Sequence, residues 1–516
     1  MKNLPLSIQT FRDIIESNNI YVDKTKDIYK LLESNEKNFF FLSRPRRFGK
    51  SLLISTLDEL FSGNKELFKG LWIYDKIEWK KYPVIRIDFT GLVYSEGIEG
   101  FKSSFDNLIK NFADKFNIKL KSKNYKEAFK NLLEELAKKE KAVILIDEYD
   151  KPIVEYIEDT VTRNQMKNIV KDFYLILKES EQYIKFVFLT GVSKFSKISV
   201  FSGLNNLRDI TLEKEFSTML GYTQKELLSY FKEHIKVTAK ALKVSQKELK
   251  DVLKSWYNGY SWDGKNFVYN PFSILNVFTS KDINNYWFRS GTPTFLIKLI
   301  KDKNINIKSL ENYTTTAEVL DSFEIENINV ESLLFQTGYL TIKEIIQYSI
   351  SDKSYILSYP NMEVKESFLR NILNNFLNSS NDDVLAGKLY RILNQDNLEE
   401  FFLTLKDIFS HIPAVIFMSD KEAYYHTIIY LILTLIGVRI SVEIYTNKGR
   451  IDAVIETENN VYIFEFKMGS SKQAIKQIEA KKYYESYLSS NKQIKLIGVD
   501  FDQKERNIGK YTVKVL

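Results

Sequence analysis

The chain has 516 residues, 44% of them hydrophobic and 27% charged, an ordinary globular balance in a length that suits about two to four domains. It has no cysteine and only three histidines, which excludes disulfides, thiolate chemistry and cysteine-based zinc sites and argues against a histidine-rich metal centre. The formal net charge of +7 is mild, so it permits nucleic-acid binding without arguing for it.

A metal ion in such a chain would be held by carboxylates and phosphates, a ligand set that suits Mg²⁺ or Mn²⁺. The N-terminus lacks the apolar core of a signal peptide. The longest apolar run, residues 428–438, is shorter than the ~20 residues that a bilayer span needs and predicts a buried helix. We therefore expect a soluble, cytoplasmic protein without a membrane partner.

Apolar strands alternate with helical segments in the first part of the chain, which predicts an α/β fold with a parallel sheet. The predicted strands are residues 38–43, 82–90, 141–150 and 183–191. The predicted helices begin near residue 51 and cover about 98–139 and 164–181.

The loop after the first strand, in "FLSRPRRFGKSLLIS" (41–55), ends in Gly49-Lys50-Ser51 ahead of a predicted helix. This is the end of the phosphate-binding pattern G-x-x-x-x-G-K-[ST], in which free backbone N–H groups and the helix dipole hold phosphate. In that interpretation Gly49 belongs to the cradle, Lys50 reaches the β- and γ-phosphates of ATP, and the Ser51 hydroxyl ligates Mg²⁺.

The first glycine of that pattern is replaced by Arg44, and Pro45 follows it. Because arginine adopts positive φ less readily than glycine and proline has no N–H, we expect a changed loop path. Arg46 or Arg47 would then supply the charge that backbone groups supply elsewhere. Taken alone, the triplet could equally be a basic turn at a helix start.

The third strand, "AVILIDEYD", ends in acids, which is the Walker B pattern. Asp147 would join the Mg²⁺ coordination sphere, and Glu148 would act as general base on the attacking water. A strand that ends in solvated acids is the plain alternative, but the two signals in this order favour nucleotide binding. Thr190 and Ser193 end the fourth strand, where a polar side chain either senses the γ-phosphate or belongs to an ordinary strand end. Lys194 and Lys197 follow, and either contact phosphate or lie on the surface.

The remaining chain changes character twice. Residues 222–300 are mostly helical, and residues 300–410 are mixed and mostly helical. From about residue 420 the order is helix, strand, turn, strand, turn, strand, helix, strand, which predicts a separate small α/β unit.

"GRIDAVIETENNVYIFEFKMG" (449–469) carries a second candidate site. Glu465 and Lys467 alternate along one strand and so share a face, and a hairpin would bring Asp452 beside Glu465. Two carboxylates and a lysine suit phosphodiester hydrolysis, with Asp452 and Glu465 binding the metal and Lys467 orienting the water or stabilising charge. A salt bridge at a strand end is the simpler interpretation of Glu465 and Lys467 alone.

Flanking helices add to this set. Glu422 lies on the preceding helix, four residues before His426, which we interpret as a packing residue. Gln477 lies on the following one, on a predicted face shared with Lys481 and Tyr484. With Glu422 and Gln477 included, the pattern favours a metal site over a salt bridge.

Several ordered motifs of the first 290 residues resemble the AAA-ATPase-like family of bacterial and archaeal proteins: "YVDKT", "RPRRFGKS", "LIDEYDKP", "TGVSKFS", "FSGLNNLRDIT" and "YNPFSIL". The family's own loop begins R-P-R-R-F-G-K-S, so the absent glycine is a trait of the family. The resemblance implies a P-loop ATPase core followed by a helical lid. The ordered set E…D…E-x-K…Q over about residues 410–516 resembles the PD-(D/E)XK nuclease superfamily. That resemblance implies Asp452, Glu465 and Lys467 as catalytic core, supported by Glu422 and Gln477.

Together these features predict a P-loop ATPase core (1–220), a helical lid (221–300), a mostly helical linker domain (301–410) and a restriction-endonuclease-like α/β domain (411–516). The expected function is an ATPase coupled to Mg²⁺- or Mn²⁺-dependent cleavage of nucleic acid, with DNA favoured. The alternative is a regulatory ATPase whose nuclease-like domain binds nucleic acid or a protein without cleaving. Whether the chain forms a homo-oligomer stays open, since P-loop ATPases often act as rings or dimers.

Overall fold

The computed structural model describes residues 1–33, 38–122, 124–194, 206–288, 296, 299–300, 303, 307–321, 329–350, 352–377, 382–410, 421–436, 445–446, 449–450, 452–502, 504–505 and 507–516. These residues divide into two compact units. The first comprises Met1–Leu296 and Leu310–Val364, and the second Ile297–Ser309 and Lys365–Leu516. The four segments predicted from the sequence remain a prediction.

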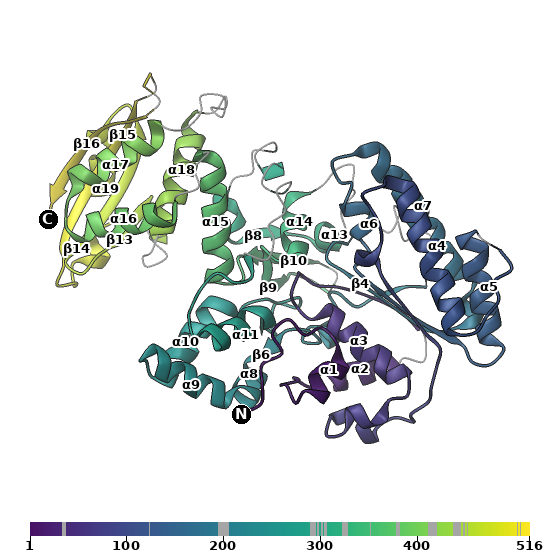
Figure 1. Cartoon of the computed structure of the whole chain (residues 1–516). Coiled ribbons are helices and arrows are strands. Elements are labelled where there is room, and N and C mark those ends of the chain that lie inside the picture. Colours follow the sequence, from purple (N-terminus) through teal and green to yellow (C-terminus); the bar gives the residue numbers. More distant parts are fainter. Residues whose placement is uncertain are drawn as a thin grey trace. The chain divides into compact units, whose positions relative to one another are not determined.

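The first unit is built on a five-stranded sheet whose strands all run parallel, which confirms the predicted fold class (Figure 1). In spatial order the strands are β2 (Val84–Asp88), β3 (Ala142–Asp147), β4 (Ile184–Gly191), β1 (Phe39–Ser43) and β5 (Arg208–Asp209). Every residue of β1 and β3 is buried, because a parallel sheet covered on both faces needs continuous apolar strands. The carboxyl ends of β1, β4 and β3 therefore lie next to one another at one edge.

The helices of this unit follow the predicted alternation. α3 contacts β2, β3 and β4, while α4, α5 and α7 pack on one another. In chain order the first helices are α1 (Phe11–Glu16), α2 (Thr25–Leu32), α3 (Lys50–Phe61), α4 (Gly97–Lys115), α5 (Tyr125–Ala137), α6 (Lys151–Val154) and α7 (Thr160–Glu179).

A helical segment follows the sheet, as expected from the sequence. It contains α8 (Gln224–Tyr230), α9 (Lys232–Leu242), α10 (Gln246–Tyr257) and α11 (Pro271–Ser280), with a short pair of strands, β6 (Tyr222–Thr223) and β7 (Val268–Tyr269). α8 begins with a capping box, in which the Thr223 hydroxyl and the Glu226 carboxylate bond each other's backbone N–H groups.

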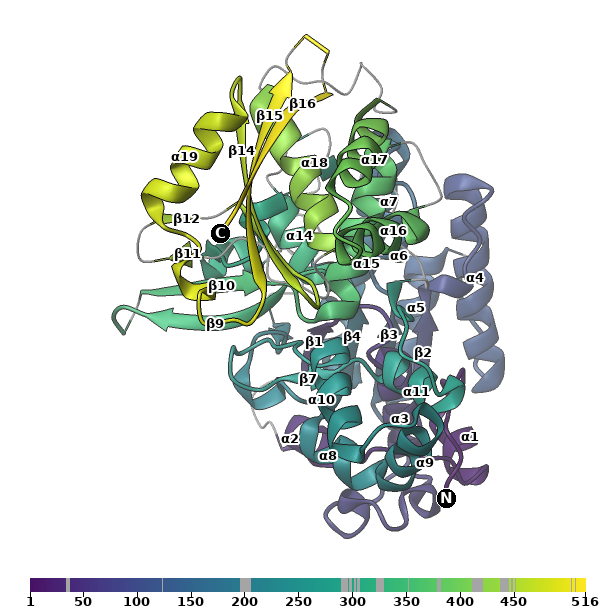
Figure 2. The same ribbon diagram turned by 90° about the vertical axis from the view of Figure 1, so that its left-hand side faces the viewer.

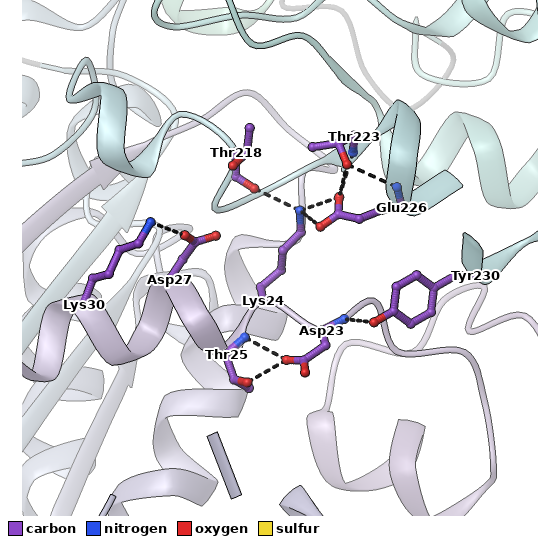
Figure 3. A network of polar contacts seen from close by, with 9 residues as sticks. All are labelled: Asp23, Lys24, Thr25, Asp27, Lys30, Thr218, Thr223, Glu226 and Tyr230. Atoms are coloured by element: carbon purple, nitrogen blue, oxygen red, sulfur yellow. Dashed lines mark hydrogen bonds and ion pairs between the residues drawn. The ribbon is translucent and has the colours of Figure 1, made fainter. Parts of the chain in front are cut away.

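The segment is attached to the N-terminal residues by a polar network that Figure 3 shows from close by. The buried Lys24 ammonium lies 2.7 Å from both carboxylate oxygens of Glu226 and donates to the Thr218 carbonyl at 2.9 Å. Asp23 accepts from the Thr25 backbone and hydroxyl, and its own N–H donates to the Tyr230 hydroxyl. The "DKT" of the first motif thus holds the start of α8.

The rest of the first unit contains a sheet that the sequence did not predict. Its antiparallel strands, in the order β8 (Tyr313–Thr315), β10 (Lys353–Ser358) and β9 (Thr341–Gln347), accompany α13 (Ala317–Asp321) and α14 (Val330–Thr337). The chain then passes from the first unit into the second within α15 (Met362–Leu377).

The second unit contains a mixed four-stranded sheet in the order β13 (Ala453–Glu456), β14 (Asn460–Met468), β15 (Gln493–Asp502) and β16 (Asn507–Val515). Figure 2 shows α19 (Ser471–Lys481) on one face of this sheet and α16 (Asp382–Asn394) and α17 (Leu398–Ser410) on the other. The remaining elements are α18 (Lys421–Ile436), β11 (Tyr445–Thr446) and β12 (Gly449–Arg450). β14 and β15 are parallel because α19 connects them as a crossover, while the other neighbours are antiparallel.

Residues 428–435 of α18 are buried, as the apolar run predicted. None of the helices within the described ranges is long and apolar enough to cross a membrane.

Candidate functional site

The arginine-rich loop, residues 44–49, leads from β1 into α3. Gly49 caps the helix at φ 94° and has open space where a Cβ would stand, so the loop uses a conformation that favours glycine. Lys50 folds back over the loop: its Nζ lies 3.2 Å from the carbonyl oxygens of Arg44 and Pro45 and 3.6 Å from the Glu148 carboxylate. The first residue of α3 therefore presents its ammonium to the end of β3.

Arg44, in the place of the missing glycine, is fully buried. Its guanidinium donates to the carbonyls of Ser43, Thr211 and Phe216 at 2.8–3.1 Å and lies 3.9 Å from the centre of the Trp262 ring. Burial lowers the pKa of Arg44 to about 9. Arg44 is thus a tether that ties the loop to a distant part of the chain.

Arg46 and Arg47, by contrast, are exposed. Arg47 has φ 65°, and its guanidinium lies 4.8 Å from the Phe272 ring centre. Arg47 and Gly49 are the left-handed residues of this loop, and the expected change in loop path stays a prediction. That either arginine supplies charge to phosphate remains a prediction.

The end of β3 meets the start of α3. The Ser51 hydroxyl hydrogen-bonds the Asp147 carboxylate, and burial raises the pKa of Asp147. Glu148 has φ 48°, a left-handed conformation that is uncommon for this residue type, and its N–H donates to Asp147 Oδ1 at 3.0 Å. The predicted residues Lys50, Ser51, Asp147 and Glu148 are thus brought together.

The polar residues at the end of β4 and just after it bond to other parts of the protein. Thr190 donates its hydroxyl to the Leu42 carbonyl at 2.8 Å, and the buried Lys194 forms an ion pair with Asp209. The Ser193 N–H donates to Asp150 at 2.7 Å. Lys194 is therefore not a surface residue. A phosphate role for Thr190, Ser193 or Lys194 stays a prediction, and Lys197 lies outside the described residues.

Asp150 is a site residue that the sequence did not identify. Besides Ser193, it lies so close to Gly191 that a Cβ there would be 2.4 Å from Asp150 Oδ1. Tyr149 adds a bond from its hydroxyl to the Ser193 carbonyl at 2.7 Å. Burial and the nearby Glu148 raise the pKa of Asp150 to about 6. The second aspartate of D-E-Y-D is visible in the sequence, but no motif spacing predicts that Asp150 bonds to Ser193 beyond the end of β4.

In the second unit, the hairpin of β13 and β14 sets the candidate metal site. The antiparallel register that pairs Ala453 with Phe464 puts Asp452 opposite Glu465, and Asp452 accepts the Phe466 N–H at 2.9 Å. Gln477, from α19, donates its side-chain amide to Glu465 Oε1.

Glu465 is the most perturbed group of this site. It is only 3% exposed, and its Oε2 has no hydrogen-bond partner among the described residues. Burial and Asp452 raise the pKa of Glu465 to about 8, although Lys467 on the same strand face opposes the rise. A buried carboxylate oxygen without a partner, beside a second carboxylate, is a suitable ligand set for a divalent cation.

The predictions for the two flanking helices have different outcomes. Glu422 lies on α18, but its side chain and that of His426 fall outside the described residues. The prediction that Tyr484 shares a helix face with Gln477 is wrong, because α19 ends at Lys481 and Lys482 takes φ 51°. Within the described part of the chain, no group of three or more His, Asp or Glu side chains is arranged to hold a metal ion.

Comparisons with known proteins identify the two domains that contain these candidate sites. The sequence model of a family described as "Predicted AAA-ATPase" matches residues 5–201, and that of the PD-(D/E)XK nuclease superfamily matches residues 420–511. A protein of Azotobacter chroococcum mcd 1, named "Uncharacterized protein in vnfD 5'region", is 34% identical over 527 residues, which span 100% of this chain and 99% of that protein.

Proposed function

The chain belongs to the AAA-ATPase-like family and carries a C-terminal PD-(D/E)XK nuclease superfamily domain, and on this premise we propose that it hydrolyses ATP to control metal-dependent cleavage of nucleic acid. DNA is the substrate we expect. The observation that carries the proposal is that the chain has two candidate sites, one in each unit. Each site is made of the residue types that its chemistry needs and lies at strand ends of its own sheet.

The ATP site that we propose lies at the carboxyl edge of the parallel sheet. The α3 N-terminus and Lys50 would bind the phosphates, and Arg46 and Arg47 would add positive charge. Ser51 and Asp147, already joined by a hydrogen bond, would hold Mg²⁺, which neutralises charge on the phosphates. Glu148 would take a proton from the attacking water.

The cleavage site that we propose lies on the α19 face of the C-terminal sheet. Asp452 and Glu465 would hold Mg²⁺ or Mn²⁺, which polarises a phosphate and acidifies a bound water. The unpartnered oxygen of Glu465 supports this assignment. Gln477 would keep the Glu465 carboxylate in place, and Lys467 would orient the water or stabilise charge developing on phosphorus. Glu422 would support the site from α18.

We further propose that ATP binding orders the helical segment after the sheet and changes the activity of the C-terminal domain. The fusion of the two domains motivates this coupling. If nucleotide changes neither cleavage nor affinity for DNA, the coupling is absent.

The test is cleavage of plasmid and single-stranded DNA in Mg²⁺ or Mn²⁺, with and without ATP. It compares the natural chain with Lys467→Ala and Lys50→Ala, and with Lys510→Ala as a control at an exposed lysine of the same C-terminal sheet. We expect Lys467→Ala to lose cleavage, Lys50→Ala to lose ATP dependence and Lys510→Ala to retain both. Intact ATP turnover without cleavage in any condition would instead identify a regulatory ATPase with a non-cleaving domain.

A further inference from the structure

Trp287 is attached to the arginine-rich loop from a part of the chain about 240 residues away. Its indole N–H donates to the Arg46 carbonyl at 3.1 Å. The ring is 5% exposed and makes edge-on contacts with Tyr339 and Tyr260, at centroid distances of 5.3 and 6.4 Å. A rigid, packed ring thus fixes one peptide of the loop, three residues before the helix cap.

Glu363 in turn fixes Trp287. The side chain is fully buried, and Oε1 accepts the Trp287 backbone N–H at 2.7 Å. The other oxygen accepts the Ser273 hydroxyl at 2.7 Å, and the Tyr286 backbone N–H also bonds to the carboxylate. A buried carboxylate is costly unless it is hydrogen-bonded, so these donors hold it in a defined position.

The position of Glu363 in the chain makes this arrangement more than local packing. It lies in the first turn of α15, the helix within which the chain leaves the first unit, and Asn361 caps that turn by accepting the Val364 N–H at 3.1 Å. Two hydrogen bonds therefore connect the start of α15 with the arginine-rich loop, through Trp287.

We propose that Trp287 and Glu363 are positioning residues of the nucleotide site: Glu363 holds Trp287, and Trp287 holds the loop peptide at Arg46 in the conformation that binds phosphate. The inference rests on the proposed ATP site.

The experiment measures ATP binding and ATP turnover in the full-length chain together with intrinsic tryptophan fluorescence. Trp287→Phe keeps an aromatic ring but removes the indole N–H, and Glu363→Ala removes the acceptor for Trp287. Glu363→Gln is the rescue, since its amide offers an oxygen to the Trp287 N–H and a donor to Ser273. Trp256→Phe is the matched control, on α10, where Trp256 packs against the core of the helical segment.

We expect Trp287→Phe and Glu363→Ala to weaken ATP binding about fivefold, the effect of one neutral hydrogen bond, while Glu363→Gln and Trp256→Phe bind like the natural chain. Binding of ATP should change the emission of the natural chain and of Trp256→Phe more than that of Trp287→Phe, in which Trp262 against Arg44 still reports on the loop. Because Trp287→Phe preserves the ring, it tests the inference even if Glu363→Ala fails to fold.

Equal ATP binding by the natural chain and Trp287→Phe, with the emission change retained in that variant, would overturn the inference and leave the proposed function standing. Absence of ATP binding by the natural chain would overturn both.

Discussion

Restoring glycine at position 44, as the common phosphate-loop pattern has it, should damage this protein, whereas the same change at position 47 should be tolerated. Arg44 is fully buried and Arg47 is exposed, although the two stand three residues apart in one loop. Arg44→Gly and Arg47→Gly therefore make the same chemical change in opposite environments.

The magnitude for Arg44→Gly comes from terms that oppose each other. Its three hydrogen bonds to carbonyls contribute about 1.5–3 kcal/mol each. Burial lowers the pKa of Arg44 from 12.5 to about 9, and that difference corresponds to about 5 kcal/mol against the charged form. These terms largely cancel, so the lost packing decides the result. A cavity left by a large buried side chain costs about 2–5 kcal/mol, and we expect Arg44→Gly to lower the free energy of unfolding by that amount.

For Arg47→Gly the terms are smaller. Glycine relieves the left-handed strain at φ 65°, about 1–2 kcal/mol, and loses a similar amount through the greater freedom of the unfolded chain. The net change should stay within about 1 kcal/mol of zero.

Urea denaturation followed by tryptophan fluorescence measures this, since the chain's five tryptophans all belong to the first unit: Trp72, Trp79, Trp256, Trp262 and Trp287. Circular dichroism provides a second probe, because Trp262 stacks on Arg44 and its emission will change directly. An Arg44→Gly midpoint equal to that of the natural chain, or a larger loss for Arg47→Gly, would refute the reasoning.

The remaining predictions concern three buried contacts. Burial raises the pKa of Glu363 from 4.5 to about 7, so folding favours the protonated carboxyl. This difference contributes about 3 kcal/mol to the free energy of unfolding. The contribution is fully present below pH 4.5 and is lost as the pH rises through 7. Urea titrations at pH 5 and pH 8 should show a loss in the natural chain that exceeds the loss in Glu363→Gln by about this amount, since the raised pKa of Asp150 contributes to both. Gly498→Ala puts a Cβ 2.1 Å from a carbonyl oxygen at the start of α19 and should destabilise the second unit by about 2 kcal/mol or more. Gly387→Ala, with open space around the new Cβ, should not. Circular dichroism in urea measures both. Lys24→Met should lower the free energy of unfolding in urea by about 2 kcal/mol, because it leaves Glu226 without its cation. Adding Glu226→Gln should recover part of that loss. A double variant that recovers nothing would contradict the pairing.

Much of the fold was predictable because local patterns determine it. Each strand of the parallel sheet that carries a site motif is a continuous apolar run, and such a run bounded by polar residues has few alternatives to a buried strand. The short antiparallel sheet of β8, β10 and β9 was not predictable, because its strands alternate weakly and β8 pairs with β10, from which α13 and α14 separate it in the chain.

Local patterns also predicted some positions in the candidate sites and failed for others. Gly49-Lys50-Ser51 and Asp147-Glu148 follow strands, and parallel strands deliver their carboxyl ends to one edge whatever the rest of the chain does. Tyr484 shows the limit of such reasoning, since helical spacing was carried past the residue where α19 ends.

The sequence by itself indicated the candidate site residues and the strand ends that present them, because side-chain type and period act over a few residues. Only the tertiary structure decided what holds those residues in place. Arg44 bonds to carbonyls about 170 residues away, and Trp287 reaches Arg46 across about 240. Sequence separation does not predict distance in space. The departure of Arg44 from the phosphate-loop pattern is therefore explained only once the groups that it bonds to are known.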